Sequence, residues 1–188
     1  MSRSSLFFFD FDDTLYSHKI KAMPDSTRRA LCLLRERGHQ VVIASGRGRE
    51  AFSLFQKELP YMPEVLILMN GQLVYRGDEL IMEQHILMDD LDRLFAMARE
   101  QKIACGGYYW DGVIADRFNE RVETVWRDFG SPFPTICSDF EKKYGIYQAQ
   151  LYITREESSL FAGEIEKYVT NWSHPYMVNL IHLLAGKS

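Results

Sequence analysis

The sequence predicts an α/β fold, in which a parallel sheet is followed by a smaller α+β unit. Three short apolar runs, at residues 6–9, 41–44 and 65–68, each lead into polar residues. Helical patterns lie between these runs, and alternating strands and helices are typical of a parallel sheet. From about residue 84 the pattern changes to hairpins and helices that favour an antiparallel sheet. In an open α/β sheet, ligands bind at the carboxyl ends of the strands.

The first apolar run leads directly into a cluster of acids, Asp10, Asp12 and Asp13. Four consecutive apolar residues before them predict a buried strand. Asp10 and Asp12 are two positions apart, so in extended backbone their side chains leave the same face and can converge on one small group. Two carboxylates that close repel each other, and a divalent cation between them would remove the repulsion. We therefore expect Asp10 and Asp12 to be metal ligands.

Phosphoryl transfer through an aspartyl-phosphate suits such a pair of acids. An aspartate with its ordinary pKa of about 4 is ionised at neutral pH, so Asp10 could act as the nucleophile without a base. Asp12 could protonate the leaving alcohol and then take a proton from the attacking water. Magnesium would offset the repulsion between the nucleophile and the phosphate. The local pattern leaves another interpretation open, in which these acids cap the next segment or bind a structural cation.

Three stretches, in order, resemble motifs of the haloacid dehalogenase (HAD) superfamily of aspartate-nucleophile phosphatases. Residues 10–15 resemble its first motif, DxDxT, and residues 42–47 are similar to its second motif. Residues 69–71 resemble the Asn-Gly signature of the Cof-like sugar-phosphate phosphatases. Asp13 departs from the pattern, because many relatives carry glycine there. The resemblance implies a Rossmann-like core with an inserted α+β cap, and a magnesium-dependent phosphatase acting on a small phosphorylated metabolite, with a sugar phosphate as the favoured class.

The second and third motifs supply candidate phosphate ligands. Ser45 follows the second strand, and its hydroxyl could hold a phosphate oxygen, while Gly46 would let the backbone approach a ligand. The Arg47 guanidinium could contact two phosphate oxygens at once. In the family the position of Asn70 borders the phosphate pocket. The alternative is an ordinary strand-to-helix turn with Arg47 in solvent. His18, in the polar loop after the first motif, could contact the substrate, although a solvated loop histidine is the commoner case.

The remaining pattern divides the chain into a core at 1–83, a cap at 84–183 and a return to the core at 184–188. In position and order the second part resembles the cap that Cof-like members insert between their second and third motifs. The expected elements are helices at 25–37 and 49–57, a hairpin at 73–82, a helix at 89–98, a hairpin at 103–116, a helix at 120–129, a strand at 146–154, a helix at 156–170 and a strand at 177–183.

The resemblance also implies features that this chain does not clearly carry. These are a third-motif lysine, for which Lys187 is the nearest candidate, and the acids of a fourth motif, GDxxND. The core then looks incomplete at its C-terminus, and the first strand would be an exposed apolar edge. Three interpretations remain open: part of a longer phosphatase, a naturally short form that dimerises or acts as a binding module, and a phosphomutase of the same superfamily.

Composition excludes several other classes. The net charge of −4 over 188 residues, without clustered Lys or Arg, argues against a nucleic-acid surface. The 46% of hydrophobic residues suffices for a core, and no stretch is long and apolar enough for a membrane span. Cys32, Cys105 and Cys137 are far apart and form no CxxC motif, which indicates free thiols in a reducing compartment. We therefore expect a cytoplasmic protein whose partner is a small metabolite, with a homodimer left open.

Overall fold

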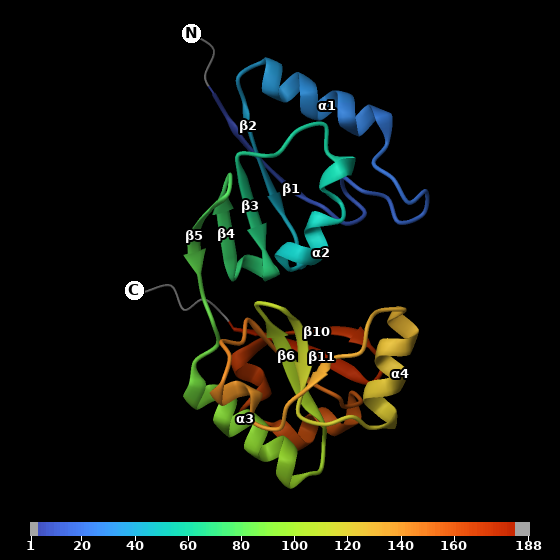
Figure 1. Cartoon of the computed structure of the whole chain (residues 1–188), viewed down its shortest axis with the longest axis vertical. Helices are drawn as coiled ribbons and strands as arrows, with labels where there is room; N and C mark the ends of the chain where they lie inside the picture. The colour runs from blue at the N-terminus through green and yellow to red at the C-terminus, as the bar shows by residue number, and fades with distance from the viewer. Residues whose placement is uncertain (1–3, 183–188) are drawn as a thin grey trace. The chain divides into compact units, whose positions relative to one another are not determined.

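The structure is a computed structural model, and it describes residues 4–182 (Figure 1). The chain divides into two compact units, of which the first ends at Gln84 and the second begins at His85. Each unit has its own sheet. The assignment of residues 1–83 to a core and 84–183 to a cap stays a prediction.

The first unit contains a five-stranded sheet in the order β1-β2-β3-β4-β5. β1, β2 and β3 pair in parallel, whereas β4 and β5 add an antiparallel hairpin. The parallel pairing follows from the helix α1 that separates β1 from β2 along the chain. The strands at 41–44 and 65–68 and the hairpin at 73–82 are thereby confirmed. The bounds are β1 Leu6–Asp10, α1 Asp25–Glu36, β2 Gln40–Ala44, β3 Val65–Leu68, β4 Leu73–Arg76 and β5 Glu79–Glu83.

β1 lies at an edge of this sheet, next to β2. Leu6 and Phe8 leave 49% and 61% of their surfaces exposed. The expectation of a buried strand was therefore wrong, because a strand with one neighbour and one covered face keeps the other face in water. The expectation of an exposed apolar edge is confirmed.

The second helix of the first unit is shorter than the sequence predicted. α2 spans Arg49–Ser53, and a 3₁₀ turn, η1, follows at Gln56–Glu58. The Phe55 N–H donates to the Phe52 carbonyl at 2.9 Å, which is the tighter bond of a 3₁₀ turn. Both rings pack edge-on against Phe11, at centroid distances of 5.1 and 5.8 Å. Packing around Phe11 therefore accompanies the early end of the helix.

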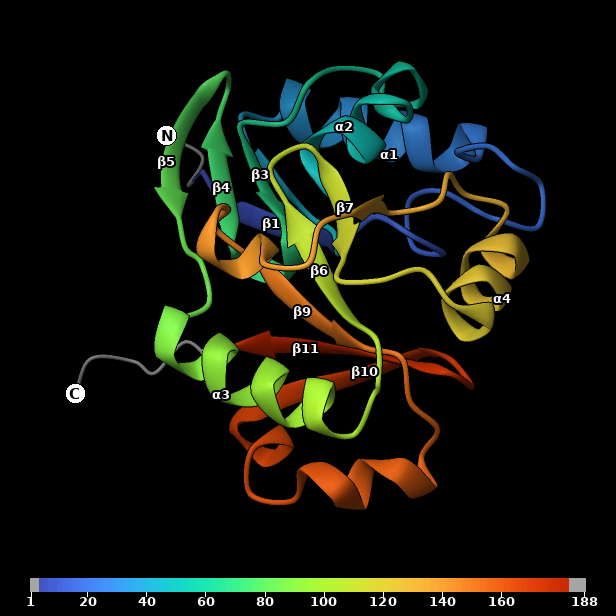
Figure 2. The same cartoon turned by 60° about the horizontal axis from the view of Figure 1, so that its bottom comes forward.

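The second unit contains a six-stranded sheet in the order β10-β11-β9-β6-β7-β8. Its pairs are antiparallel except for the short parallel pair β7-β8. α3 lies along this sheet (Figure 2) and buries the face that its periodicity predicted, Leu91, Leu94, Phe95 and Ala98. The bounds are α3 Met88–Glu100, β6 Cys105–Tyr109, β7 Gly112–Ala115, α4 Glu120–Phe129, β8 Thr135–Ile136, β9 Gln148–Leu151, β10 Tyr168–His174 and β11 Met177–His182.

The helix predicted at 156–170 does not form, and that prediction was wrong. The segment holds two 3₁₀ stretches, η4 at Glu156–Phe161 and η5 at Ile165–Lys167, and then enters β10. Gly163, at φ 84°, interrupts any continuous helix. Val169 and Thr170 are β-branched and pair with β11. Pairing with a distant strand therefore overrides the local helical periodicity.

Several expectations concern the end of the chain or its surroundings. Leu183, Lys187 and the segment 184–188 lie outside the described residues. Within residues 4–182, no helix is long and apolar enough to cross a membrane. Cys32, Cys105 and Cys137 are free thiols, as expected.

Candidate active site

The carboxyl ends of β1, β2 and β3 bring the predicted motifs to one edge of the first sheet. Asp10 is the last residue of β1 and lies opposite Ala44, the last residue of β2. Ser45 follows β2 directly, and its N–H donates to the carbonyl of Ile67 in β3 at 2.8 Å. Segments that are far apart in the sequence therefore meet at the position where an open α/β sheet binds its ligands.

The four predicted phosphate ligands form one contacting group at this edge. The Asn70 N–H donates to the Ser45 carbonyl at 3.3 Å, and the Met69 N–H donates to the Arg47 carbonyl at 3.0 Å. The Arg47 N–H donates to the Ser45 hydroxyl at 3.2 Å. A Cβ atom on Gly46 would stand only 3.2 Å from Asn70 Oδ1, so glycine lets the Asn70 amide lie close to this turn.

The turn after β3 holds a strained backbone. Met69 and Asn70 both adopt left-handed conformations, with φ of 51° and 56°. Asparagine tolerates the left-handed region, whereas this backbone conformation costs roughly 1–2 kcal/mol for methionine. Such strain persists only where the surroundings fix the backbone, and it gathers at functional sites. The hydrogen bonds to Ser45 and Arg47 fix it here.

Phe11 fixes the segment between the two motif aspartates. Its side chain is fully buried, and its ring stacks on Tyr16 with centroids 5.7 Å apart. Asp10, in contrast, is exposed. Its carboxylate has no hydrogen-bond or ion-pair partner among the residues that the structure describes. The Asp10 carboxylate is therefore available to a ligand.

Asp12 is held by two neighbours. Arg47 donates to both carboxylate oxygens, from Nη2 to Oδ1 at 2.7 Å and from Nε to Oδ2 at 3.0 Å. His18 Nε2 lies 2.8 Å from Oδ1. The Arg47 guanidinium also lies over the Phe55 ring, 4.1 Å from its centroid. The alternative of Arg47 in solvent is therefore wrong, and the guanidinium N–H groups are directed at the Asp12 carboxylate.

These contacts set the protonation of Asp12. Partial burial raises the pKa of its carboxyl, but the hydrogen bonds and positive charge supplied by Arg47 and His18 outweigh burial. The net effect holds the pKa of Asp12 below its ordinary value. Asp12 is therefore a carboxylate in this state of the protein.

His18 is a residue that the sequence interpretation missed. It was expected to be a solvated loop histidine, but its ring contacts Asp12 and its N–H donates to Asp13 Oδ1 at 3.1 Å. Asp13 sits at φ 56°, which turns the loop back on itself. The only local signal for this contact was a histidine in a polar loop six positions after Asp12.

The residues at this edge fit magnesium in the type of their donors. Mg²⁺ prefers oxygen ligands, often one or two carboxylates completed by waters and substrate phosphates. The free Asp10 carboxylate meets that preference. Within the described part of the chain, no cluster of three or more His, Cys, Asp or Glu side chains could hold a metal. The site thus offers part of a magnesium shell rather than a closed protein cage.

A Rossmann-like sheet with an aspartate ending its first strand, beside a Ser-Gly-Arg turn, defines a protein of the HAD class. Residues 7–187 match the model of the haloacid dehalogenase-like hydrolase family, and the chain belongs to that family. The resemblance and the fold class inferred from the sequence are thereby confirmed.

Known relatives agree with this assignment. The chain is 36% identical over 174 residues to the provisionally named phosphatase YkrA of Bacillus subtilis (strain 168), covering 90% of this chain and 65% of that protein. A hypothetical protein from Geobacillus kaustophilus HTA426 shares the fold with a TM-score of 0.83 at 21% identity, over 96% of this chain and 70% of that chain. The HAD phosphatase BT1666 from Bacteroides thetaiotaomicron has a TM-score of 0.81 at 23% identity, over 98% of this chain and 68% of that chain. The chain thus spans slightly less than two thirds of its curated relative.

Proposed function

We propose that this protein is a magnesium-dependent phosphatase that hydrolyses a small phosphorylated metabolite through an aspartyl-phosphate on Asp10. The supporting observation is that the unpaired Asp10 carboxylate lies at the same carboxyl edge of β1, β2 and β3 as the turns that hold Ser45, Arg47 and Asn70. Asp10 supplies the nucleophile, and the group Ser45, Gly46, Arg47 and Asn70 supplies donors for the transferred phosphoryl group. A sugar phosphate is the favoured substrate class. One of the solved structures of the same fold, at 24% identity, is a sugar phosphatase.

The chemistry divides into two steps. A carboxylate oxygen of Asp10 forms a bond to phosphorus as the bond to the ester oxygen breaks, and Asp12 gives that oxygen a proton. Water then attacks the acyl-phosphate, Asp12 takes the proton from water, and Asp10 and inorganic phosphate are released. The donors around Ser45 stabilise the charge that develops on the phosphoryl oxygens.

The Asp12–Arg47 ion pair has a consequence for substrate binding. The N–H groups that Arg47 directs at Asp12 are the ones that would fork two phosphate oxygens. A bound phosphate therefore competes with Asp12 for Arg47. Losing that partner removes a contact that favours the charged carboxylate, so Asp12 gains proton affinity when the substrate is in place.

The Asp10 carboxylate and the Asp12 backbone carbonyl are the groups that would hold magnesium. When bound, the ion supplies positive charge between an anionic nucleophile and an anionic phosphate. The binding of the phosphoryl group by Ser45 and Arg47 does not depend on it.

Release of inorganic phosphate from an aryl phosphate, with and without magnesium, tests the proposal. Asp10→Asn should lower turnover by about a thousandfold or more, because the nucleophile is lost. Asp13→Asn makes the same chemical change three positions away and preserves the side-chain oxygen that accepts the His18 N–H, so it should retain activity. Turnover that survives Asp10→Asn would refute the aspartyl-phosphate route.

Products separate hydrolysis from the alternative of a phosphomutase. With a sugar phosphate as substrate, a phosphatase releases free inorganic phosphate and a mutase gives an isomeric sugar phosphate. We propose in addition that the protein works in a reducing compartment, the cytoplasm, in keeping with its three free thiols.

A further inference from the structure

A groove in the second unit carries an arginine, Arg155, that forms no ion pair with an acid among residues 4–182. The groove has two adjoining hollows, of about 670 and 490 Å³, which share Tyr176 as a wall. Small-molecule sites commonly occupy about 300–1,000 Å³. The smaller hollow lies between the loop at 154–156 and the turn that joins β10 to β11.

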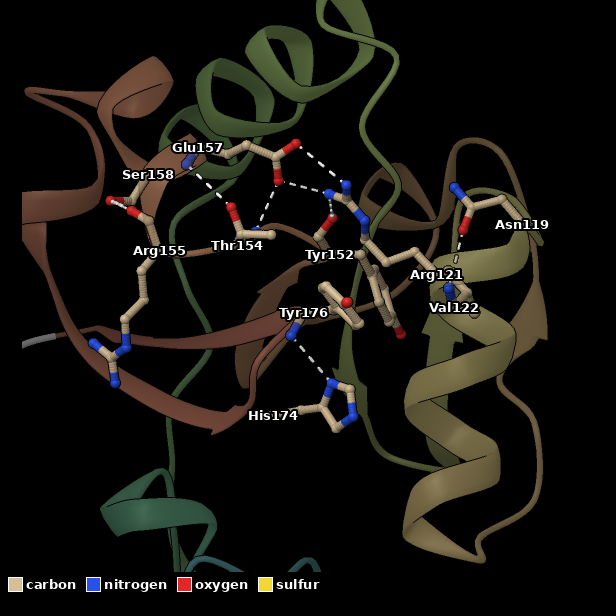
Figure 3. A network of polar contacts seen from close by, with 10 residues as sticks. All are labelled: Asn119, Arg121, Val122, Tyr152, Thr154, Arg155, Glu157, Ser158, His174 and Tyr176. Atoms are coloured by element: carbon tan, nitrogen blue, oxygen red, sulfur yellow. Dashed lines mark hydrogen bonds and ion pairs between the residues drawn. The ribbon is translucent and has the colours of Figure 1, made fainter.

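The groove contains two arginines, Arg121 and Arg155, which differ in their partners (Figure 3). Arg121 donates to both oxygens of Glu157, at 2.6 and 3.2 Å, and to the Tyr152 carbonyl at 2.9 Å. Arg155 extends away from that network, and no acid pairs with it among the residues that the structure describes. Its guanidinium lies over the Trp172 ring, 4.8 Å from the centroid. The stacking orients the guanidinium while leaving its N–H groups free for an oxyanion.

The loop that carries Arg155 is fixed in place. The Thr154 N–H donates to Glu157 Oε2 at 2.8 Å, and the Glu157 N–H donates to the Thr154 hydroxyl at 3.4 Å. Through Glu157, the loop is tied to Arg121 in α4. Arg155 is therefore presented from an ordered loop, which reduces the entropy lost on binding.

The opposite wall offers aromatic surface. Tyr176 is 41% exposed, its ring lies 5.6 Å from that of His174, and its N–H donates to His174 Nδ1 at 3.1 Å. His174 Nε2 contacts Asp128 at 3.2 Å, so this histidine is already engaged. The Arg121 guanidinium lies 5.8 Å from the centre of the Tyr176 ring, so a flat or ring-shaped ligand would pack on the ring surface that Arg121 leaves exposed.

We propose that the smaller hollow is a second binding site, for a ring-bearing phosphate ester, with the phosphate on Arg155 and the ring on Tyr176. The acid on this rim, Glu156, is exposed and places a negative charge near Arg155, but no ion pair joins the two side chains within residues 4–182. Nucleoside monophosphates and sugar phosphates share this chemistry. The site lies wholly within the second unit and does not use the residues of the proposed active site.

Calorimetric titration tests this site, using magnesium-free Asp10→Asn protein so that no probe is consumed. AMP and glucose 6-phosphate are the two probes, and adenosine and inorganic phosphate each supply only one half of the ligand. We expect saturable binding of at least one of the two phosphate esters, at least tenfold tighter than either half alone. The ester that binds more tightly shows whether the site prefers a nucleoside monophosphate or a sugar phosphate. Failure of both esters to bind, or equal binding of adenosine and AMP, would overturn the proposal.

Variants assign the binding to this hollow. Arg155→Gln should weaken the ester at least tenfold, and Tyr176→Ala should weaken the ester but not inorganic phosphate. Arg127→Gln removes the same charge from an exposed ion pair in α4 and should bind like the parent. Arg47→Gln tells the two sites apart. If Arg47→Gln lost binding of the ester while Arg155→Gln kept it, the ester would be bound at the proposed active site, and the proposed second site would be refuted. This result is independent of phosphate release, which alone decides the proposed phosphatase activity.

Discussion

The two units each contain an Arg–carboxylate pair, and the pairs differ in burial. At the carboxyl edge of the first sheet, the side chains of Arg47 and Asp12 are 25% and 32% exposed. In the second unit Arg99 pairs with Glu141, whose carboxylate is fully buried. Water and ligands can compete for the first pair, whereas Arg99 is the cation that pairs with Glu141 within the described part of the chain. The first pair can therefore exchange partners with a ligand, whereas the second one stabilises the fold.

Breaking the buried pair should give the largest effect on stability. Arg99→Met leaves Glu141 without its cation and removes a hydrogen bond to the Ser138 carbonyl. An uncompensated buried charge costs about 3–5 kcal/mol, so the free energy of unfolding should fall by that order. Urea unfolding followed by far-UV circular dichroism measures it.

Arg93 provides the matched control, because its pairs with Asp90 and Glu164 involve a side chain that is 53% exposed. Arg93→Met should cost less than about 1 kcal/mol. Equal losses for the two variants would mean that burial does not distinguish these pairs.

The exposed pair should show the reverse pattern, with a large effect on substrate and a small one on folding. A hydrogen bond to a charged group contributes about 1.5–3 kcal/mol. Arg47→Gln should therefore raise KM for an aryl phosphate by about tenfold or more, while the free energy of unfolding changes by less than about 1 kcal/mol. Steady-state kinetics and urea unfolding measure the two quantities.

Arg49 is the control for Arg47. It is also stacked on an aromatic ring, that of Tyr75 at 4.5 Å, and it sits only two positions further along the chain. Arg49→Gln should leave KM unchanged. A similar rise in KM for both variants would indicate a general loss of positive charge rather than a phosphate contact by Arg47.

Sequence reasoning succeeded where the signal is local. The apolar runs before Asp10, Ser45 and Met69 predicted the strands and the polar ends that meet at one edge. Asn119 before α4 and Gly130 after it mark the helix ends, and the structure shows the Asn119 cap on the Val122 N–H and a left-handed Gly130. In each case the residue acts on its own neighbours in the chain.

The failures involve partners that are distant in the sequence. Tyr168 pairs with His182, and residues 156–170 do not identify that partner strand, although Val169 and Thr170 are β-branched. Asp12 and Arg47 are 35 positions apart, so the motif could suggest a phosphate contact for Arg47 but not its pairing with Asp12. The roles of Asp10, Asp12, Ser45 and Asn70 in catalysis stay predictions that the kinetic variants decide.

A second partly exposed pair is that of Arg121 and Glu157, which are both about one third exposed. The hydrogen bond from Arg121 lowers the pKa of Glu157 below its ordinary value. A carboxyl with a lowered folded-state pKa stabilises the protein above its unfolded pKa of about 4.3, and loses that contribution as pH falls through the folded-state pKa. The difference in unfolding free energy between the parent and Glu157→Gln should be constant near neutral pH and shrink below about pH 4.

Urea unfolding across a pH series measures this difference. Arg121→Gln should remove the same pH-dependent contribution, because the pair acts as a unit. A difference that stays constant to the lowest pH at which the protein folds would show that Glu157 stabilises the loop by packing and not by charge.

The smallest expected effect on stability concerns the free edges of the two sheets. β1 exposes Leu6 and Phe8 at 49% and 61%, more than the 37–41% of Leu80, Ile81 and Met82 on β5, the other edge of the same sheet. In the second sheet the edge strand β10 is more polar and β8 has only two residues. An exposed apolar edge is a template for strand pairing between molecules. We therefore expect the parent protein to self-associate through β1, as a dimer or larger species.

Phe8→Thr keeps a strand-forming residue and should reduce that association in size-exclusion chromatography with light scattering, while changing the free energy of unfolding by less than about 0.5 kcal/mol. Leu54→Thr removes a side chain that is 70% exposed but lies outside the strands, so it should associate like the parent. If Leu54→Thr were as effective as Phe8→Thr, surface hydrophobicity in general, and not the β1 edge, would drive the association.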